Sequence, residues 1–280
     1  MRTFLIYCLA TTPLVAQGTR VFMIADAEGV GGVCRQDQTD PKDPKDPEMR
    51  QLLTGEINAA VQGFMDGGAS EVVVWDGHDG SQTLSTLTID PRAKLAMGEI
   101  GLTMLMERKW SAIAFVGQHA RADSRGGVMA HSYSSLGIQK ILMNGSPVGE
   151  IETRAALAGW FNVPVAFLSG DQMAAEQLRA IVPQAEVAVV KEGLANYACI
   201  SLSADAARQL IRQHAAAAIA RLGSMRPYRI DGPVTFEIEY TSRHALGPDA
   251  GLKPGSEVLD ARTIRYRGKD FLEAWLRAPM

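Results

Sequence analysis

Five acidic and imidazole side chains fall where buried strands are predicted to end or a helix to begin. Asp26 and Glu28 follow the apolar run Val21–Ile24, and in an extended chain their spacing points both carboxylates the same way. Two such carboxylates repel each other unless a cation lies between them. Later segments add three further possible ligands, which are His78, His119 and Glu150. We therefore predict a metal site at the carboxyl edge of a sheet, where ligands of α/β proteins collect.

The composition of this ligand set narrows the choice of metal. Imidazole nitrogen combined with carboxylate oxygen favours zinc, or manganese or cobalt, over magnesium and calcium. Three carboxylates and two imidazoles are rather rich for one ion. They are sufficient for two ions that share a bridging carboxylate. The sequence thus favours a binuclear centre.

Each of these residues also has a purely structural interpretation. An aspartate or histidine after a strand often belongs to a turn, and Glu150 stands where it would stabilise a helix start through the helix dipole. Asp76 either orients His78 or caps the following turn. The metal interpretation is favoured by the joint placement of the residues. The chain has five histidines, of which His214 and His244 are interpreted as structural or surface residues and His131 falls in the same region as His78 and His119.

Apolar runs and amphipathic stretches predict the scaffold that carries these residues. Strands are expected at 21–24, 71–75, 112–116, 163–168 and 186–190, and helices at 48–66, 150–160, 172–181 and 203–222. Strand–helix–strand order argues for a parallel sheet with right-handed crossovers. The proline-rich stretch Asp37–Pro47 predicts a surface loop because dense prolines exclude a helix. The expected fold class is α/β, with a largely parallel sheet flanked by helices.

A hairpin in the middle of the chain and the segment after Arg226 depart from the strand–helix alternation. Asn144-Gly145 between apolar runs predicts a hairpin over residues 138–148. Expected strands at 233–240 and 257–266, followed by a helix at 268–277, indicate a smaller mixed α+β C-terminal part. We expect a catalytic metal-binding domain over residues 17–190 and a C-terminal part over residues 191–280 that completes the fold or an oligomer.

Composition restricts the possible partners. The chain has 280 residues and a formal net charge of −3, without a cluster of lysine and arginine. Nucleic acid is therefore not an expected partner. After residue 16 no apolar stretch approaches the length of a membrane span, so no membrane association is expected once a leader is removed.

The first sixteen residues resemble a secretory signal peptide. Arg2 precedes a short apolar core, and small residues follow near Ala16. The protein is then expected in the periplasm or outside the cell, or in the cytoplasm if the leader is not a signal. Cys8 would leave with the leader. Cys34 and Cys199 would remain, and the sequence leaves open whether they pair.

Five motifs together resemble the zinc D-aminopeptidase family. They are Asp26-Ala27-Glu28-Gly29, Trp75-Asp76-Gly77-His78, Gly117-Gln118-His119-Ala120-Arg121-Ala122, Gly127-Val128-Met129-Ala130-His131-Ser132 and Pro147-Val148-Gly149-Glu150. Their order matches from about residue 20 to the C-terminus, and the stretches 162–165 and 169–171 also fit. Each fragment alone is weak, whereas the combination is specific.

The resemblance implies a metallo-aminopeptidase with two zinc ions per subunit. Asp26 matches the residue that bridges both ions, Glu28 and His78 match the ligands of one ion, and His119 and Glu150 match those of the other. His131 matches the active-site histidine. The family hydrolyses short peptides with an N-terminal D-residue, such as D-Ala-D-Ala, and forms a ring-shaped decamer. A homo-oligomer acting on small D-amino-acid peptides is therefore expected.

Several functional alternatives stay open at this point. His131 is expected to donate a proton to the leaving amine, stabilise the oxyanion or act as nucleophile, and the sequence does not choose among these roles. Another binuclear amidase or esterase that acts on non-peptide substrates is the nearest enzyme alternative. An exported metal- or solute-binding protein without turnover is the alternative of a different class.

Overall fold

Two sheets form the scaffold of the protein, whose computed structural model describes residues 18–98 and 100–280. The predicted leader over residues 1–16, with Cys8, lies outside these described residues. The larger sheet has the strand order β3-β2-β1-β4-β7-β8-β9, and all neighbouring pairs are parallel except β8 and β9. Its strands are β1 Thr19–Ala25, β2 Ala69–Asp76, β3 Ala93–Ala96, β4 Ala112–Gln118, β7 Val165–Asp171, β8 Glu186–Ala195 and β9 Ala198–Ser201.

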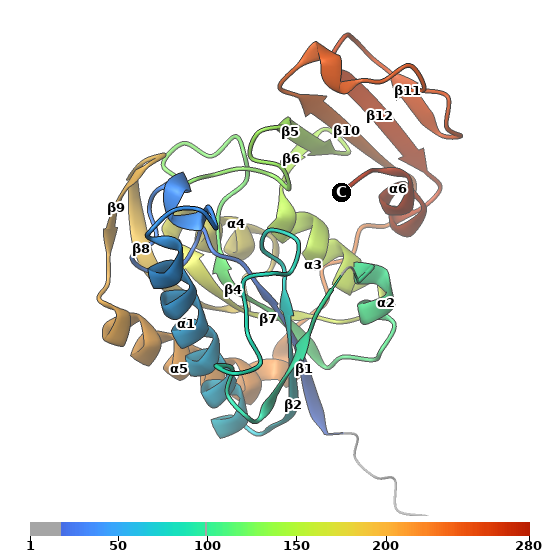
Figure 1. The fold of residues 1–280 in the computed structure, drawn as a ribbon. Helices are drawn as coiled ribbons and strands as arrows, with labels where there is room; N and C mark the ends of the chain where they lie inside the picture. Colours follow the sequence, from blue (N-terminus) through green and yellow to red (C-terminus); the bar gives the residue numbers. More distant parts are fainter. Residues whose placement is uncertain (1–17, 99) are drawn as a thin grey trace, which may run out of the picture.

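Side chains along β1 alternate between the two faces of this sheet, and each face has its own core. Val21 and Met23 pack with residues of α1 and α5, whereas Phe22 and Ile24 pack with residues of α3 and α4. Figure 1 shows α1 and α5 together on one side of the sheet. The helices are α1 Asp46–Asp66, α2 Leu102–Met106, α3 Glu150–Trp160, α4 Gln172–Ile181 and α5 Ala204–Arg221. Helices on both faces of a largely parallel sheet confirm the predicted α/β fold.

The smaller sheet is antiparallel, with the order β11-β12-β10-β5-β6, and it projects from the larger part with α6 beside it (Figure 1). The predicted hairpin supplies two of its strands, and because α3 begins directly after β6, this sheet sets where α3 starts. Its elements are β5 Ile138–Met143, β6 Ser146–Val148, β10 Val234–Tyr240, β11 Ser256–Val258, β12 Thr263–Gly268 and α6 Phe271–Arg277.

The structure differs from the sequence prediction at several element boundaries. The predicted loop Asp37–Pro47 overlaps a 3-10 turn, Gln36–Thr39, and its end belongs to α1, because proline is tolerated in the first helical turn. The single strand predicted over 257–266 is two antiparallel strands, β11 and β12. The short elements β3, α2 and β9 were not predicted, since segments of four or five residues carry little periodicity.

The two sheets do not separate at residue 190. Strand β9 follows that residue yet belongs to the larger sheet, and α5 packs against α1. The hairpin β5–β6 precedes it yet belongs to the smaller sheet. The division into domains at residue 190 stays a prediction. Among the described helices, none combines the length and the apolar character needed to cross a bilayer.

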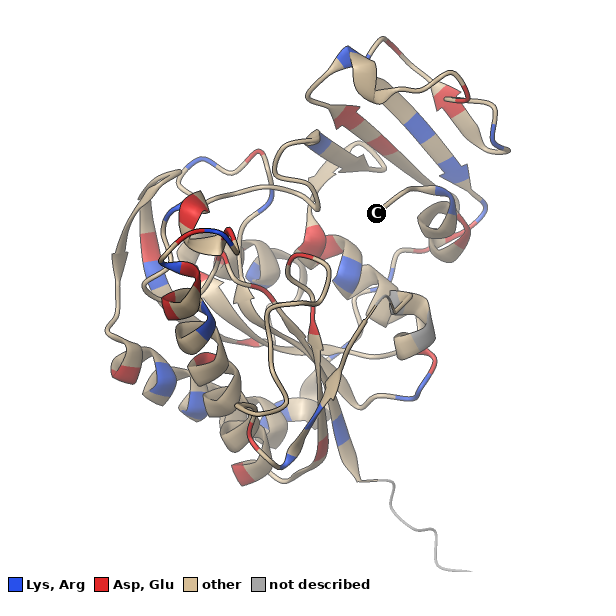
Figure 2. Cartoon of the chain, viewed as in Figure 1, with Lys and Arg blue, Asp and Glu red and all other residues tan. Residues whose placement is uncertain are grey.

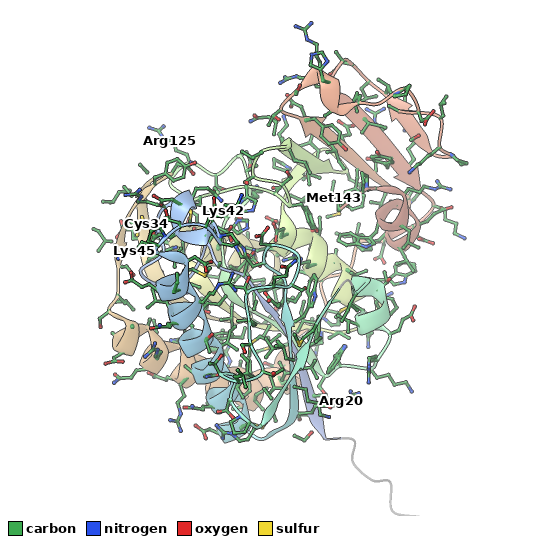
Figure 3. All side chains as sticks on the ribbon, in the orientation of Figure 1. Arg20, Cys34, Lys42, Lys45, Arg125 and Met143 are labelled. Atoms are coloured by element: carbon green, nitrogen blue, oxygen red, sulfur yellow. The ribbon has the colours of Figure 1, made fainter. Side chains whose placement is uncertain are left out.

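Cys34 and Cys199 come together in the structure as half-buried free thiols, with Cys34 labelled in Figure 3. Ser201 on β9 accepts a hydrogen bond from Gly32, which aligns β9 with the segment that follows β1. Burial and a hydrogen bond with Cys199 raise the pKa of the Cys34 thiol to about 11. The turn after β1 thus lies against the edge strand of the sheet.

Glycines allow the turn after β1 to lie directly on the end of β4. Asp26 and Gly29 donate backbone hydrogen bonds to Val116 and Gly117, at 2.9 and 2.7 Å. Gly117 has a φ of 72°, and a Cβ there would stand 2.1 Å from the carbonyl oxygen of Asp26. Only glycine combines this conformation with this approach.

Replacing Gly117 by alanine is expected to lower the free energy of unfolding by about 2 kcal/mol or more, because both the steric overlap and the left-handed conformation add cost. Denaturant unfolding of Gly117→Ala measures this loss. Gly223→Ala is the matched control, since a Cβ at Gly223 meets no atom within 4 Å. Equal unfolding midpoints for the two variants would contradict the close packing of the β1 turn on β4.

Candidate metal centre

The five predicted ligands converge where the strand order of the larger sheet changes direction. From β1 the chain proceeds outward through β2 and β3, and it then returns to the other side of β1 as β4. In open α/β sheets this switch point is the usual ligand position. Asp26, His78 and His119 follow β1, β2 and β4, which are adjacent strands, and Glu150 enters as the first residue of α3.

One side of the centre is formed by Asp26, Glu28 and His78. The Nδ1 atom of His78 lies 3.3 Å from Oδ1 of Asp26 and 3.2 Å from Oε2 of Glu28. All three residues are buried. The backbone amide of Ala27 and the side-chain amide of Gln118 donate hydrogen bonds to the two oxygens of Asp26, at 2.9 and 3.4 Å, which fixes the direction of this carboxylate.

The other side is formed by His119, Glu150 and His131. The Nε2 atom of His119 lies 3.4 Å from Oδ2 of Asp26 and 3.5 Å from Oε1 of Glu150. The imidazoles of His119 and His131 stack with their centroids 3.9 Å apart and their planes at 17°. Asp26 therefore directs one oxygen toward each side of the centre, which is the arrangement that a bridging carboxylate requires.

The donor atoms are close enough to share ions. Asp26, Glu28 and His119 each offer an atom within 4.8 Å of the other two, and so do His119, His131 and Glu150. Because His119 belongs to both groups, the two groups overlap. The predicted acids and imidazoles therefore lie close together in the structure. The role of each residue as a ligand stays a prediction.

Two buried donor atoms test whether these residues fit a metal. Oε2 of Glu28 and Nε2 of His119 are buried, and their contacts with charged groups among the described residues are with other members of the centre, at 3.2 to 3.5 Å. Buried polar atoms normally have partners. Nδ1 of His119 lies 2.9 Å from the carbonyl oxygen of Ala120, and a hydrogen bond there directs Nε2 into the centre as an electron-pair donor. Imidazole and carboxylate donors left free in this way fit a zinc-type ion.

The electrostatics of the centre favour a bound cation. Burial lowers the pKa of His78, but the charge of Glu28 and hydrogen bonds to both acids outweigh burial and raise this pKa to about 11. Burial raises the pKa of Asp26, yet hydrogen bonds to His119 and His78 hold it well below its usual range. The clustered carboxylates thus favour positive charge within the centre. A divalent cation neutralises the same acids more fully than a singly charged imidazolium does.

The centre opens into a cavity of about 690 Å³. His131, Tyr133 and Leu136 line one part of it, and acidic residues of the loops after β1 and β2 line another. Tyr133 donates a backbone hydrogen bond of 2.9 Å to Oε1 of Glu150, so the loop that carries His131 is tied to the start of α3. This volume accommodates a small ligand beside the donor atoms.

A buried lysine holds the turn that carries Glu28. Lys191, in the middle of β8, donates hydrogen bonds to the carbonyl oxygens of Glu28, Val30 and Val33. Glu56 of α1 accepts a hydrogen bond of 2.8 Å from the backbone amide of Gly31. Two elements therefore hold the turn in place, β8 of the larger sheet and α1 of the helix layer that covers it. The sequence prediction missed both supports, although a lysine within an apolar strand was a possible signal.

The remaining candidates have structural roles. Oδ2 of Asp76 accepts hydrogen bonds from the backbone amides of Thr83 and Leu84, at 2.7 and 2.8 Å, so Asp76 caps the turn after β2. His214 pairs with Glu186 at 2.9 Å, and His244 is exposed in the C-terminal part. These positions agree with the structural or surface interpretation.

Comparison with known proteins establishes the family. A family model described as D-aminopeptidase matches residues 19–278, and the chain therefore belongs to the D-aminopeptidase family. The protein is accordingly a hydrolase of peptide bonds. The D-aminopeptidase of Bacillus subtilis (strain 168) is 29% identical over 260 residues, which cover 91% of this chain and 94% of that protein.

A solved structure extends the likeness to the fold. It is the Zn-dependent D-aminopeptidase DppA from Bacillus subtilis, described as a self-compartmentalizing protease. The TM-score is 0.85 at 28% identity, and the match covers 92% of this chain and 94% of that one. The family resemblance inferred from the five motifs is confirmed.

Glu56 provides a test of the buried support under the metal centre. Burial raises its pKa to about 7, against the hydrogen bond from Gly31 and the charge of Lys191. The folded state binds this proton more tightly than the unfolded state, so the free energy of unfolding should fall as pH rises from about 4.5 to about 7. Glu56→Gln keeps an acceptor for Gly31 and should remove a decline on the order of 3 kcal/mol.

Denaturant unfolding at pH 5 and pH 8 measures the change, as the difference between variant and wild type. Glu48→Gln is the control, because Glu48 lies on an exposed side of the same helix. The interpretation fails if Glu56→Gln and Glu48→Gln show the same dependence on pH.

Proposed function

We propose that this protein is a binuclear zinc aminopeptidase that hydrolyses short peptides with an N-terminal D-amino acid, such as D-Ala-D-Ala. The observation that carries the proposal is the position of Asp26, whose two oxygens face His78 and His119 on opposite sides of the centre. Membership of the D-aminopeptidase family and the likeness to a Zn-dependent structure support it. Manganese or cobalt would suit the same donors.

The proposed ligands divide between two ions. Asp26 would bridge the two ions, Glu28 and His78 would complete one site, and His119 and Glu150 would complete the other. Zinc bound there supplies a water of lowered pKa and polarises the scissile carbonyl. The residues around the centre keep the donors buried and correctly directed, and the cavity beside them receives the peptide.

His131 is the proposed catalytic histidine. Its Nδ1 atom lies 2.9 Å from the carbonyl oxygen of Met129, and a hydrogen bond there leaves Nε2 available for proton transfer. The residue is half-buried, lines the cavity and stacks on His119. Its place between cavity and ligands supports protonation of the leaving amine or stabilisation of the oxyanion.

The assembly and location of the protein belong to the same proposal. We expect a homo-oligomer, a decamer if it follows the family, because the structurally similar DppA is described as self-compartmentalizing. Residues 1–16 are proposed to direct export to the periplasm or beyond. Light scattering on the purified protein and N-terminal sequencing of the mature chain test these two points.

Metal analysis tests the binuclear centre. The wild-type protein purified with zinc should retain two ions per chain. Asp26→Ala should retain fewer than one, because both ions lose a shared ligand, whereas His78→Ala should keep the ion at the other site. The measurement is zinc content by mass spectrometry after gel filtration. Retention of no transition metal by the wild type, or of two ions by Asp26→Ala, would refute the bridged arrangement.

The role of His131 is tested separately from metal binding. His131→Ala should lower kcat for D-Ala-D-Ala at least about 100-fold, the range of proton-transfer catalysis, while the zinc content stays at the wild-type level. His214→Ala is the matched control, because that imidazole pairs with Glu186 away from the cavity. Near-normal turnover by His131→Ala would disprove the assignment. Loss of zinc in this variant would make His131 a ligand.

A substrate panel distinguishes the proposed activity from its rivals. D- and L-aminoacyl amides, D-Ala-D-Ala and simple esters should show a preference for the free amine and the D-configuration. Hydrolysis of esters or N-blocked amides instead would indicate a different binuclear hydrolase. Zinc binding without hydrolysis of any compound would indicate a binding protein.

A further inference from the structure

Arg154 is a buried cation at the edge of the proposed active site. It lies one helical turn after Glu150 on α3, is 6% exposed and lines the site cavity. Figure 2 shows the acidic start of α3 followed by a basic turn. A buried arginine is costly unless its charge is satisfied, and Glu150 is the one carboxylate that pairs with it among the described residues.

The contacts of Arg154 leave part of its guanidinium group unused. Its Nη1 atom forms an ion pair with Oε2 of Glu150 at 2.8 Å, whereas no hydrogen bond from its Nε or Nη2 atom is found among the described residues. The group lies 5.6 Å from the ring centroids of both Trp75 and Tyr133. The aromatic rings hold the plane of the guanidinium without consuming its donors.

The cavity is otherwise acidic. Arg154 is the one arginine or lysine among the described residues that line it. Six carboxylates line the same space, namely Asp26, Glu28, Asp37, Asp40, Asp79 and Glu150. An anionic group that enters this cavity therefore has a single fixed cation to bind, apart from any metal ion. A cationic group, by contrast, meets acids on several loops.

We propose that Arg154 binds the C-terminal carboxylate of a dipeptide substrate. The proposal rests on the proposed aminopeptidase function and deepens it by naming the substrate class. A free dipeptide carries an ammonium group at one end and a carboxylate at the other. The acids that line the cavity suit the first, and the unused donors of Arg154 suit the second. Arginine binds carboxylates with two parallel hydrogen bonds, so the contact also fixes substrate length.

The proposal predicts a preference for dipeptides over their C-terminal amides. The wild-type kcat/KM should be about 10- to 100-fold higher for D-Ala-D-Ala than for D-Ala-D-Ala amide, which is the usual effect of a charge-assisted hydrogen bond. In Arg154→Met this ratio should fall to near one. Arg154→Lys should keep part of it, because lysine retains the charge but not the planar pair of donors.

The ratio separates substrate binding from the effect of Arg154 on Glu150. If the substitution disturbs Glu150, kcat/KM falls by the same factor for both substrates and the ratio does not change. If it removes the contact with the substrate carboxylate, kcat/KM falls for the dipeptide alone. Arg121→Met is the matched control. Arg121 also binds a glutamate of α3, Glu152 at 2.9 Å, but it lines a different cavity. Its ratio should equal that of the wild type.

Equilibrium binding supplies a readout that does not need turnover. Calorimetry with zinc-loaded His131→Ala should show weaker binding of the amide than of D-Ala-D-Ala, and adding Arg154→Met should remove the difference. If the wild type hydrolyses and binds D-Ala-D-Ala and its amide equally well, or if the kcat/KM ratio of Arg154→Met equals that of the wild type, the carboxylate site is refuted. Either result leaves the proposed aminopeptidase function standing. If neither ligand binds and neither is hydrolysed, the carboxylate site and the proposed function fall together.

Discussion

Repulsion among buried carboxylates is the constraint on which the site depends. Asp26, Glu28 and Glu150 are each about 95% or more buried, and they lie around two imidazoles at the edge of the larger sheet. Such a cluster is costly unless positive charge is placed within it. These carboxylates raise the pKa of both imidazoles, and the likeness to a Zn-dependent structure supports zinc as the source of the positive charge.

The rest of the fold serves to hold these groups against their repulsion. Gly29 and Gly117 let the turn after β1 lie on β4, and Lys191 on β8 donates hydrogen bonds to the carbonyl oxygens of that turn. The hairpin β5–β6 of the smaller sheet leads directly into α3 and so places Glu150 at the centre. There Arg154 lies beside Oε2 of Glu150. Both sheets therefore contribute to a centre that neither could form alone.

The cavity follows from the same geometry. The loops after β1 and β2 supply its acids, and the loop around Tyr133 supplies its more apolar part. His131, the proposed catalytic histidine, lies in this loop, and the hydrogen bond from the backbone of Tyr133 to Glu150 keeps the loop near the proposed ligands. The proposed ligands, the loop that carries His131 and the cavity are thus connected through the first turn of α3.

Local sequence determined the parts of this protein that depend on periodicity and on residue type. Three patterns were enough to predict the α/β fold: the apolar run before Asp26, the Asn144-Gly145 turn and the order of strands and helices. The acids and imidazoles were enough to predict a metal site. Tertiary structure alone decided which atoms meet. The supports from Lys191 and Arg154, the capping role of Asp76 and the return of β9 to the larger sheet depend on contacts between distant segments, which no local pattern encodes.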